Sequence, residues 1–291
     1  MNNEIKSLFN LTKFNYVQTD MIITSKNGNP KAIITRRIEN NVVEHLSTSK
    51  EQNTIMKHIK QVSTPKLITM WHNICSQMPK NIFIFVRRTL IFSLPNNSNL
   101  CRWWKIESAF CILCTSNKQT QLHMLSNCPV SVTVTEGRYT WRHDSILYTL
   151  LQYLFQLKNY GFNIYGDLEG YCKTSEFFHS FRPDIVLIKD DTIYILELTC
   201  CFETNTKKSK NFKINNDCMR RFRHCKKIFI EITSLGLVTT HIENLNSIFK
   251  ETDINYKRMI AKCMEVAMRA SFYIYIRRNK PWTYPPLLKF Y

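Results

Sequence analysis

The sequence predicts an α/β fold in which helices flank a small mixed sheet. Two β-rich runs within residues 182–199 flank a polar turn, and residues 227–233 (KIFIEIT) predict a third strand. Between them, residues 204–227 predict a basic helix, and residues 253–278 predict a long closing helix from apolar positions three and four apart. Strands that alternate with helices in this way are typical of the α/β class.

The first half of the chain predicts mainly helices. Residues 1–60 are rich in Asn, Lys and Thr, so we expect loosely packed helices and turns up to a boundary near residues 63–65. Lys66–Val86 carries apolar residues at helical spacing and predicts one amphipathic helix. The turn-forming residues of Leu94–Asn99 predict a loop. Ser145–Lys158 predicts a helix buried along one side.

The composition indicates a globular protein with a polyanionic partner. Among 291 residues, 40 Lys and Arg stand against 22 Asp and Glu, which gives a formal net charge of +18. A hydrophobic share of 44% is enough to bury a core. An excess of positive charge this large favours nucleic acid over a membrane surface as the partner.

Other classes lack their sequence signals. Residues 1–4 (MNNE) do not lead into an apolar stretch, so we expect no signal peptide and a reducing compartment. The apolar runs Asn81–Leu94 and Ser145–Leu157 are interrupted by polar residues, so we expect no membrane span. The sequence has no GxGxxG or GxxxxGK motif, so we expect neither a dinucleotide nor another organic cofactor.

A group of cysteines and one histidine predicts a metal site. Cys111, Cys114, His123 and Cys128 follow the spacing C-x2-C-x8-H-x4-C. Such a Cys3His set can complete a tetrahedron around zinc and leaves no position for a catalytic water, so the ion would be structural. The alternative is a chance CxxC in a cysteine-rich chain, with His123 a polar surface residue.

A pair of acids predicts a second metal site. A two-residue turn at Asp190–Asp191 would pair the flanking residues. Continuing that register places Asp184 directly opposite Glu197 on one face, with Cβ atoms about 4.5–5.5 Å apart. Carboxylates on otherwise apolar strands need a neutralising cation, and a shared divalent metal such as Mg2+ would activate a water against a phosphodiester. The alternative is a pair of solvated surface acids near a turn.

A basic segment follows the second strand. Thr199 stands where a catalytic Lys could have been, and positive charge appears instead in the next segment. There we expect phosphate contacts from Lys207, Lys208, Lys210, Arg220, Arg221 and Arg223. The alternative is a solvated helix face.

The order of these motifs resembles the C-terminal tail of non-LTR retrotransposon polyproteins, in which a zinc knuckle precedes a restriction-like endonuclease of the PD-(D/E)XK type. Residues 70–240 carry the resemblance. The Cys3His set matches the knuckle, Arg142 and His143 match an Arg-His element, and Pro183-Asp184 with Glu197 match the nuclease acids. The resemblance implies a restriction-endonuclease-like sheet flanked by helices.

The resemblance also implies further site residues. The run 197–205 (ELTCCFETN) is similar to a family segment that implicates Glu203 as an accessory acid. Lys213 fits the active-site Lys on the following helix, with Lys210 as a substitute, but Asp217 stands where the family has a Tyr. Arg142 and His143, together with Trp103 and Trp104, are candidates for contacts to nucleic acid, although such aromatic residues are more often part of a core.

The sequence therefore predicts a metal-dependent DNA endonuclease module that nicks target DNA. The reverse transcriptase that accompanies such a module in the resembled polyproteins is not part of this chain. The implied ions are structural Zn2+ and catalytic Mg2+ or Mn2+, the partners are a DNA target and element RNA, and the location is nuclear. The alternatives are an inactive nucleic-acid-binding module and a remnant that merely folds. The expected parts are a polar region (1–65), a helical linker (66–110), the knuckle with its Arg-His junction (111–144) and the nuclease domain (145–291).

Overall fold

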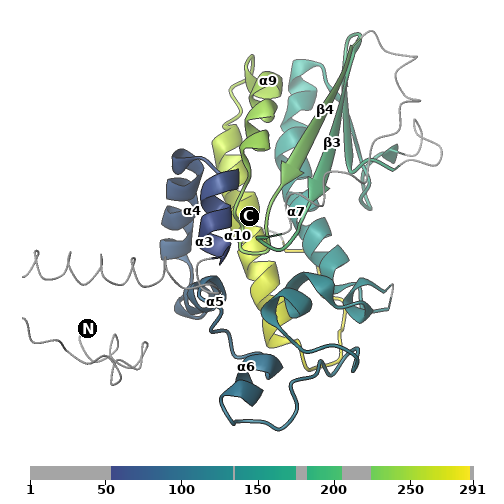
Figure 1. Cartoon of the computed structure of the whole chain (residues 1–291). Helices are drawn as coiled ribbons and strands as arrows, with labels where there is room; N and C mark the ends of the chain where they lie inside the picture. The colour runs from purple at the N-terminus through teal and green to yellow at the C-terminus, as the bar shows by residue number, and fades with distance from the viewer. Residues whose placement is uncertain (1–53, 134, 175–181, 205–223, 289–291) are drawn as a thin grey trace, which may run out of the picture. The chain divides into compact units, whose positions relative to one another are not determined.

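The computed structural model describes residues 54–133, 135–174, 182–204 and 224–288 (Figure 1). Contacts divide the chain into a unit of residues 1–48 and a unit of residues 49–291, and all described residues belong to the second. The loosely packed helices and turns expected for residues 1–53 lie outside the described residues. The helices are α3 Thr54–Val62, α4 Pro65–Gln77, α5 Lys80–Leu90, α6 Asn97–Arg102, α7 Arg138–Leu154, α9 Asn246–Phe249 and α10 Tyr256–Ile276.

The single helix expected over Lys66–Val86 is wrong, because two helices occupy this region. Pro79 separates α4 from α5, and Met78 before it adopts an extended backbone, as residues preceding proline do. The loop expected over Leu94–Asn99 is also shorter than predicted. The side chain of Asn96 accepts a hydrogen bond from the Asn99 amide, so this asparagine caps α6 instead of continuing a turn.

Two long helices form the centre of the described structure. The helix expected over Ser145–Lys158 is confirmed as far as Leu154, but it begins earlier, at Arg138, so that the Arg-His junction forms the first turns of α7. The closing helix is confirmed as α10. α7 and α10 lie side by side next to the sheet (Figure 1). Within the described ranges, no helix combines the length and apolarity that crossing a membrane requires.

A mixed sheet of four strands has the order β1-β2-β3-β4. The expected strands appear as β2 Ile185–Lys189, β3 Thr192–Thr199 and β4 His224–Glu231, and the sequence reading missed the short β1 Asn163–Gly166. β1, β2 and β3 pair antiparallel, whereas β4 runs parallel to β3. The basic helix expected over 204–227 is wrong for residues 224–227, because they begin β4. Residues 205–223 of the expected helix lie outside the described part.

The hairpin register is the one that the sequence predicts. Lys189 pairs with Thr192 across a two-residue turn. Asp190 has a φ of 51°, a left-handed conformation that a short polar side chain tolerates in such turns. Because side chains alternate along a strand, this register decides which residues share a face.

The two faces of the sheet differ in what covers them. Leu187 and Leu196 belong to the main hydrophobic core, which also takes in Leu150 of α7 and Met264 of α10. On the opposite face Val186, Ile193 and Ile195 form a smaller buried cluster. The protein is thus a mixed α/β structure in which helices flank a four-stranded sheet. The expected division of residues 66–291 into three parts stays a prediction.

A glycine turn after β4 fixes the sheet to α10. Gly236 has a φ of 78°, and a Cβ atom at this position would collide with the backbone carbonyl of Met264. Only glycine fits both the left-handed backbone and the close approach.

Candidate functional site

The segment that carries the Cys3His set is held in shape by its own backbone. Phe110 and Lys118 form an isolated antiparallel bridge. Within this small loop the Cys111 amide donates to the Asn117 carbonyl, and the Thr115 amide donates to the Cys111 carbonyl. A tight turn of this kind brings two cysteines that are three residues apart to the same side.

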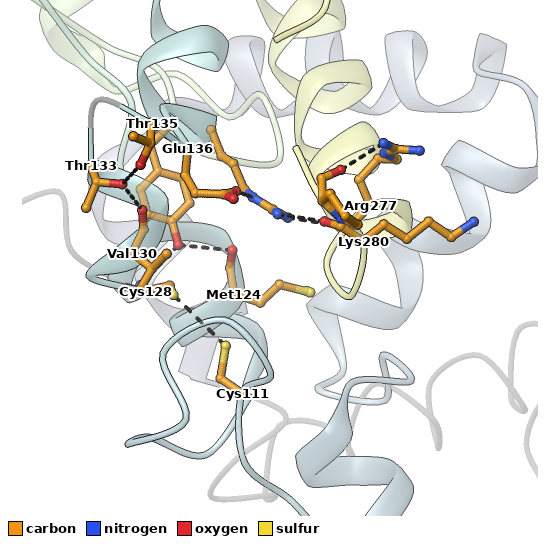
Figure 2. A network of polar contacts seen from close by, with 12 residues as sticks. Cys111, Met124, Cys128, Val130, Thr133, Thr135, Glu136, Arg277 and Lys280 are labelled. Carbon is orange, nitrogen blue, oxygen red and sulfur yellow. Dashed lines mark hydrogen bonds and ion pairs between the residues drawn. The ribbon is translucent and has the colours of Figure 1, made fainter. Parts of the chain in front are cut away.

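The four predicted ligands converge, which confirms that Cys111, Cys114, His123 and Cys128 form a cluster that could hold a metal ion such as zinc. Their ligand atoms all lie within 4.8 Å of one another. Cys111 Sγ is 4.0 Å from Cys128 Sγ, and Cys114 Sγ is 3.4 Å from His123 Nε2 (the cysteine pair is drawn in Figure 2). A tetrahedral zinc ion about 2.3 Å from each sulfur separates two sulfurs by about 3.8 Å.

These distances fit metal ligation and not a disulfide, whose sulfurs are about 2.05 Å apart. Burial raises the pKa of Cys111, but the ionisation of His123 and Cys114 fits metal ligation. Burial lowers the pKa of His123 and so favours its neutral, ligating form. Burial raises the pKa of Cys114, but hydrogen bonds from the Asn117 and Ser116 backbone outweigh it and bring that pKa down to about 7. A thiol with this pKa is easily converted to the thiolate that a metal requires.

Tyr139 in the first turn of α7 anchors the cluster to the main core. Its hydroxyl donates to the carbonyls of His123 and Met124, at 2.9 and 3.1 Å, and accepts a bond from the Cys128 amide at 3.1 Å. Burial raises the pKa of Tyr139 to about 12, so the hydroxyl stays a donor. Sequence reasoning missed this residue, because nothing in the spacing distinguishes it from other aromatic residues.

The neighbouring Arg138 ties α7 to the segment after α10. Its guanidinium donates to Glu136 at 2.7 Å and to the carbonyls of Arg277 and Lys280. Figure 2 labels these three partners. The Trp282 ring lies under the same guanidinium, 5.1 Å from its carbon. The first turns of α7 therefore hold the Cys–His cluster and the C-terminal segment together.

The two predicted acids lie at the end of the hairpin. Ile185 pairs with Leu196, so that Asp184, the residue before β2, comes opposite Glu197 when the register is continued by one position. Alternation puts both residues on the face of Val186 and Ile195, and each acid is only 5% exposed. Asp184 Oδ2 accepts a bond of 2.7 Å from the Leu198 amide. The reading of these acids as solvated surface residues is therefore wrong.

His143 of α7 joins this acidic end of the hairpin. Its Nε2 is 3.5 Å from Asp184 Oδ1, and its Nδ1 is 3.1 Å from Asp144 Oδ1. Burial lowers the pKa of His143, but the hydrogen bonds and charges of Asp144 and Asp184 outweigh it and raise that pKa to about 9. The imidazolium therefore supplies positive charge beside Asp184 near neutral pH. Sequence reasoning missed Asp144, although it directly follows the Arg-His pair.

Glu203 lies apart from these contacts. It is buried, accepts a bond of 2.6 Å from the Leu235 amide and receives the Ser234 hydroxyl at 3.0 and 3.1 Å. Burial raises the pKa of Glu203, with these hydrogen bonds opposing the shift. Its carboxylate thus binds the turn after β4, a role that the sequence reading did not anticipate for an accessory acid.

No protein-family model matches this chain, and a search of curated proteins finds no match either. The candidate functions therefore depend on the geometry of the two clusters and on the charge of the chain.

The remaining predicted residues fall into three groups. Arg142 is only 1% exposed and donates to Ser271 Oγ of α10 at 3.0 Å, so it fixes α7 to α10 and presents little surface to a polyanion. Trp103 and Trp104, in contrast, are exposed. The expected cations of the basic segment lie outside the described residues, namely Lys207, Lys208, Lys210, Lys213, Arg220, Arg221 and Arg223.

Proposed function

We propose that the protein is a metal-dependent DNA endonuclease module that nicks target DNA by hydrolysing a phosphodiester. The observation that carries the proposal is the buried pair of Asp184 and Glu197, at opposite register positions on one face of the sheet. Two carboxylates removed from water in this way are costly unless cations neutralise them. His143 supplies one positive charge, and a divalent cation would supply more.

The fold is compatible with the restriction-like endonuclease that the motif order resembles. α7 precedes three antiparallel strands, and a connection then leads to β4, which is parallel to β3. The Cys3His cluster directly precedes this unit, as the zinc knuckle does in the resembled polyproteins. Zinc is the ion that we assign to this cluster, since three thiolates and one imidazole are its common structural ligand set.

In the proposed reaction Asp184 and Glu197 would hold Mg2+ or Mn2+. Such an ion, when bound, lowers the pKa of a coordinated water and offsets negative charge at the phosphate. The Leu198 amide fixes one oxygen of Asp184, and His143 orients the other. Lys213 is the proposed source of the positive charge that stabilises the transition state, and Glu203 supports the turn after β4.

A plasmid assay tests the proposal. Purified protein should nick supercoiled plasmid with Mg2+ or Mn2+, and Asp184→Ala or Glu197→Ala should abolish nicking. Glu251→Ala removes an exposed acid, is expected to leave activity unchanged and serves as the control. Circular dichroism and the zinc content establish that each variant is folded. Unchanged nicking by both acid variants would remove these residues from the site.

A second candidate function is a nucleic-acid-binding module that has lost catalysis. Among the residues that the structure describes, the Cys3His set forms the one group of three or more potential ligand side chains close enough to share an ion. Asp184 and Glu197 are therefore not joined by a third described ligand, which favours a chain without catalysis. Asp217 in place of the family's Tyr favours the same candidate. Salt-sensitive DNA binding without cleavage under any divalent metal would support it over the endonuclease.

The partners and the location follow from the same proposal. A net charge of +18 suits a DNA target and element RNA. A protein derived from a retrotransposon and acting on chromosomal DNA would work in the nucleus. Nuclear accumulation of a tagged chain, with its loss on neutralising the basic residues of 207–227, would test this assignment.

A further inference from the structure

Exposed apolar side chains concentrate in one short segment beside the Cys–His cluster. Five of the nine large hydrophobic residues that are exposed in the described part of the chain lie within ten positions. They are Trp103, Trp104, Ile106, Phe110 and Ile112. Scattered exposed hydrophobic residues are ordinary, whereas a concentration of this kind marks an interaction surface.

Trp104 is the most exposed of them and the most constrained. Its side chain is 94% exposed, and its φ is 57°, in the left-handed region that a bulky residue rarely adopts. The turn is held by three backbone bonds, from the amides of Trp103, Trp104 and Lys105 to the carbonyls of Asn99, Cys101 and Leu100. The backbone thus holds an indole out into solvent at a free-energy cost that packing does not offset.

The turn and the metal-binding loop form one surface. The Asn97 side chain at the start of α6 donates to the Phe110 carbonyl at 2.9 Å. The amides of Asn97 and Ser98 donate to the side chain and backbone carbonyl of Gln119. These bonds clamp α6 to both ends of the loop 110–119. Figure 1 shows α6 at the end of the described structure remote from β3 and β4.

Positive charge accompanies these aromatic residues. Arg102, Lys105 and Lys118 lie among them and are exposed, against a single acid, Glu107, between residues 102 and 118. Arg102 also lines a pocket of about 460 Å3 whose wall includes Phe202 and Thr204, shortly after β3. The pocket therefore lies between α6 and the segment that follows β3.

We propose that the surface of residues 102–118 binds an unpaired stretch of nucleic acid. Bases stack on Trp103 and Trp104, and phosphates meet Arg102, Lys105 and Lys118. Every base has a flat face that stacks on an aromatic ring, whereas paired bases in a duplex are already stacked on each other. The choice of nucleic acid as the partner rests on the proposed function. The proposal deepens that function by making a single-stranded part of the nucleic acid the preferred ligand.

The experiment is a binding titration that does not depend on cleavage. Fluorescence anisotropy is measured in EDTA-free buffer without added divalent metal, using a labelled single-stranded oligonucleotide and the duplex of the same sequence. The wild-type protein should prefer the single strand. Trp104→Ala should weaken its binding about tenfold or more, and Trp104→Phe should retain most of it. Lys105→Ala should weaken binding to both ligands and reduce the slope against salt by about one ion.

Phe155→Ala removes an exposed aromatic residue at the C-terminal end of α7 and is the matched control, with an expected affinity equal to wild type. Zinc content and melting temperature show that the variants are folded. Equal single-strand affinity of the wild type and Trp104→Ala would overturn the proposal. The proposal would also be overturned if Trp104→Ala lost binding to phosphatidylserine vesicles but kept its binding to DNA. The surface would then bind a membrane.

The two proposals fail separately. If Trp104→Ala loses single-strand binding but the wild type never nicks plasmid, the binding surface stands and the endonuclease falls. If plasmid nicking depends on Asp184 while Trp104→Ala binds single strands as well as wild type, the endonuclease stands and the binding surface falls.

Discussion

The imidazole of His143 lies against the carboxylate of Asp184, with Nε2 3.5 Å from Oδ1. The two residues are far apart in the sequence, one in the second turn of α7 and the other at the start of the hairpin. One turn earlier in the same helix, Tyr139 bonds the segment that holds the Cys–His cluster. The first two turns of α7 thus contact both candidate sites.

A double-mutant cycle should detect coupling between His143 and Asp184. Removing either partner takes a charged contact from a side chain that is buried or half-buried, so His143→Ala and Asp184→Ala each lower the free energy of unfolding. Because they remove the same interaction, their effects should be non-additive by about 0.5–3 kcal/mol in urea unfolding. The pair His143 and Glu251 is the control, since these residues do not touch. Additive effects for the first pair would show that the contact contributes nothing.

Zinc removal should unfold the loop around the cluster. The protein should retain about one zinc per chain after dialysis, because four ligands converge. Cys111→Ser and Cys128→Ser should each lose the ion and lower the melting temperature. Cys172→Ser, which removes an exposed cysteine outside the cluster, should change neither quantity. Atomic absorption and limited proteolysis measure the outcome, and a zinc-free wild type would contradict the assignment.

Tyr139→Phe should loosen the cluster without removing any ligand. The substitution leaves the Cys128 amide and two carbonyls without their partner, which costs about 1–3 kcal/mol when such groups are buried. Zinc transfer to a chelator should become faster, and the melting temperature should fall. Tyr153→Phe is the matched control on the same helix. Identical zinc release from both variants would show that the hydroxyl does not support the site.

The pH dependence of stability should report on Glu203. Burial raises its folded-state pKa above the ordinary value of 4.5, so the folded chain binds more protons than the unfolded chain above that pH. The contribution of Glu203 to stability is therefore greatest below pH 4.5 and declines as the pH rises through the folded-state pKa. Glu203→Gln cannot titrate, so the stability of the wild type relative to this variant should fall over the same window. If the stability of the wild type relative to Glu203→Gln instead rose with pH, the pKa of Glu203 would be lowered by folding and not raised.

Gly236→Ala should be among the more destabilising single substitutions. The added methyl group meets the Met264 backbone, which cannot move away as a side chain could, and the left-handed φ adds strain. Gly170→Ala separates the two causes, because Gly170 has a φ of 88° but open space where the methyl group would go. Thermal unfolding should show a loss for Gly236→Ala clearly larger than for Gly170→Ala. Equal losses would mean that only the backbone conformation matters.

Local patterns accounted for much of the fold. Alternating β-rich residues around Asp190–Asp191 predicted the hairpin and its register, since the turn length alone determines which residues pair. Apolar periodicity located α7 and α10. It failed to divide Lys66–Val86, because the break depends on the backbone conformation that Pro79 imposes on Met78. β1 was missed since its four residues are too few for a period to show.

The sequence by itself determined the two sets of chemically distinctive residues, because ligand spacing and strand register are properties of short segments. Only the tertiary structure decided what surrounds them. It buried Arg142 against Ser271, directed Glu203 to the turn at Leu235 and placed His143 beside Asp184. These contacts join residues distant in the chain, so they follow from how α7, α10 and the sheet pack and not from any local pattern.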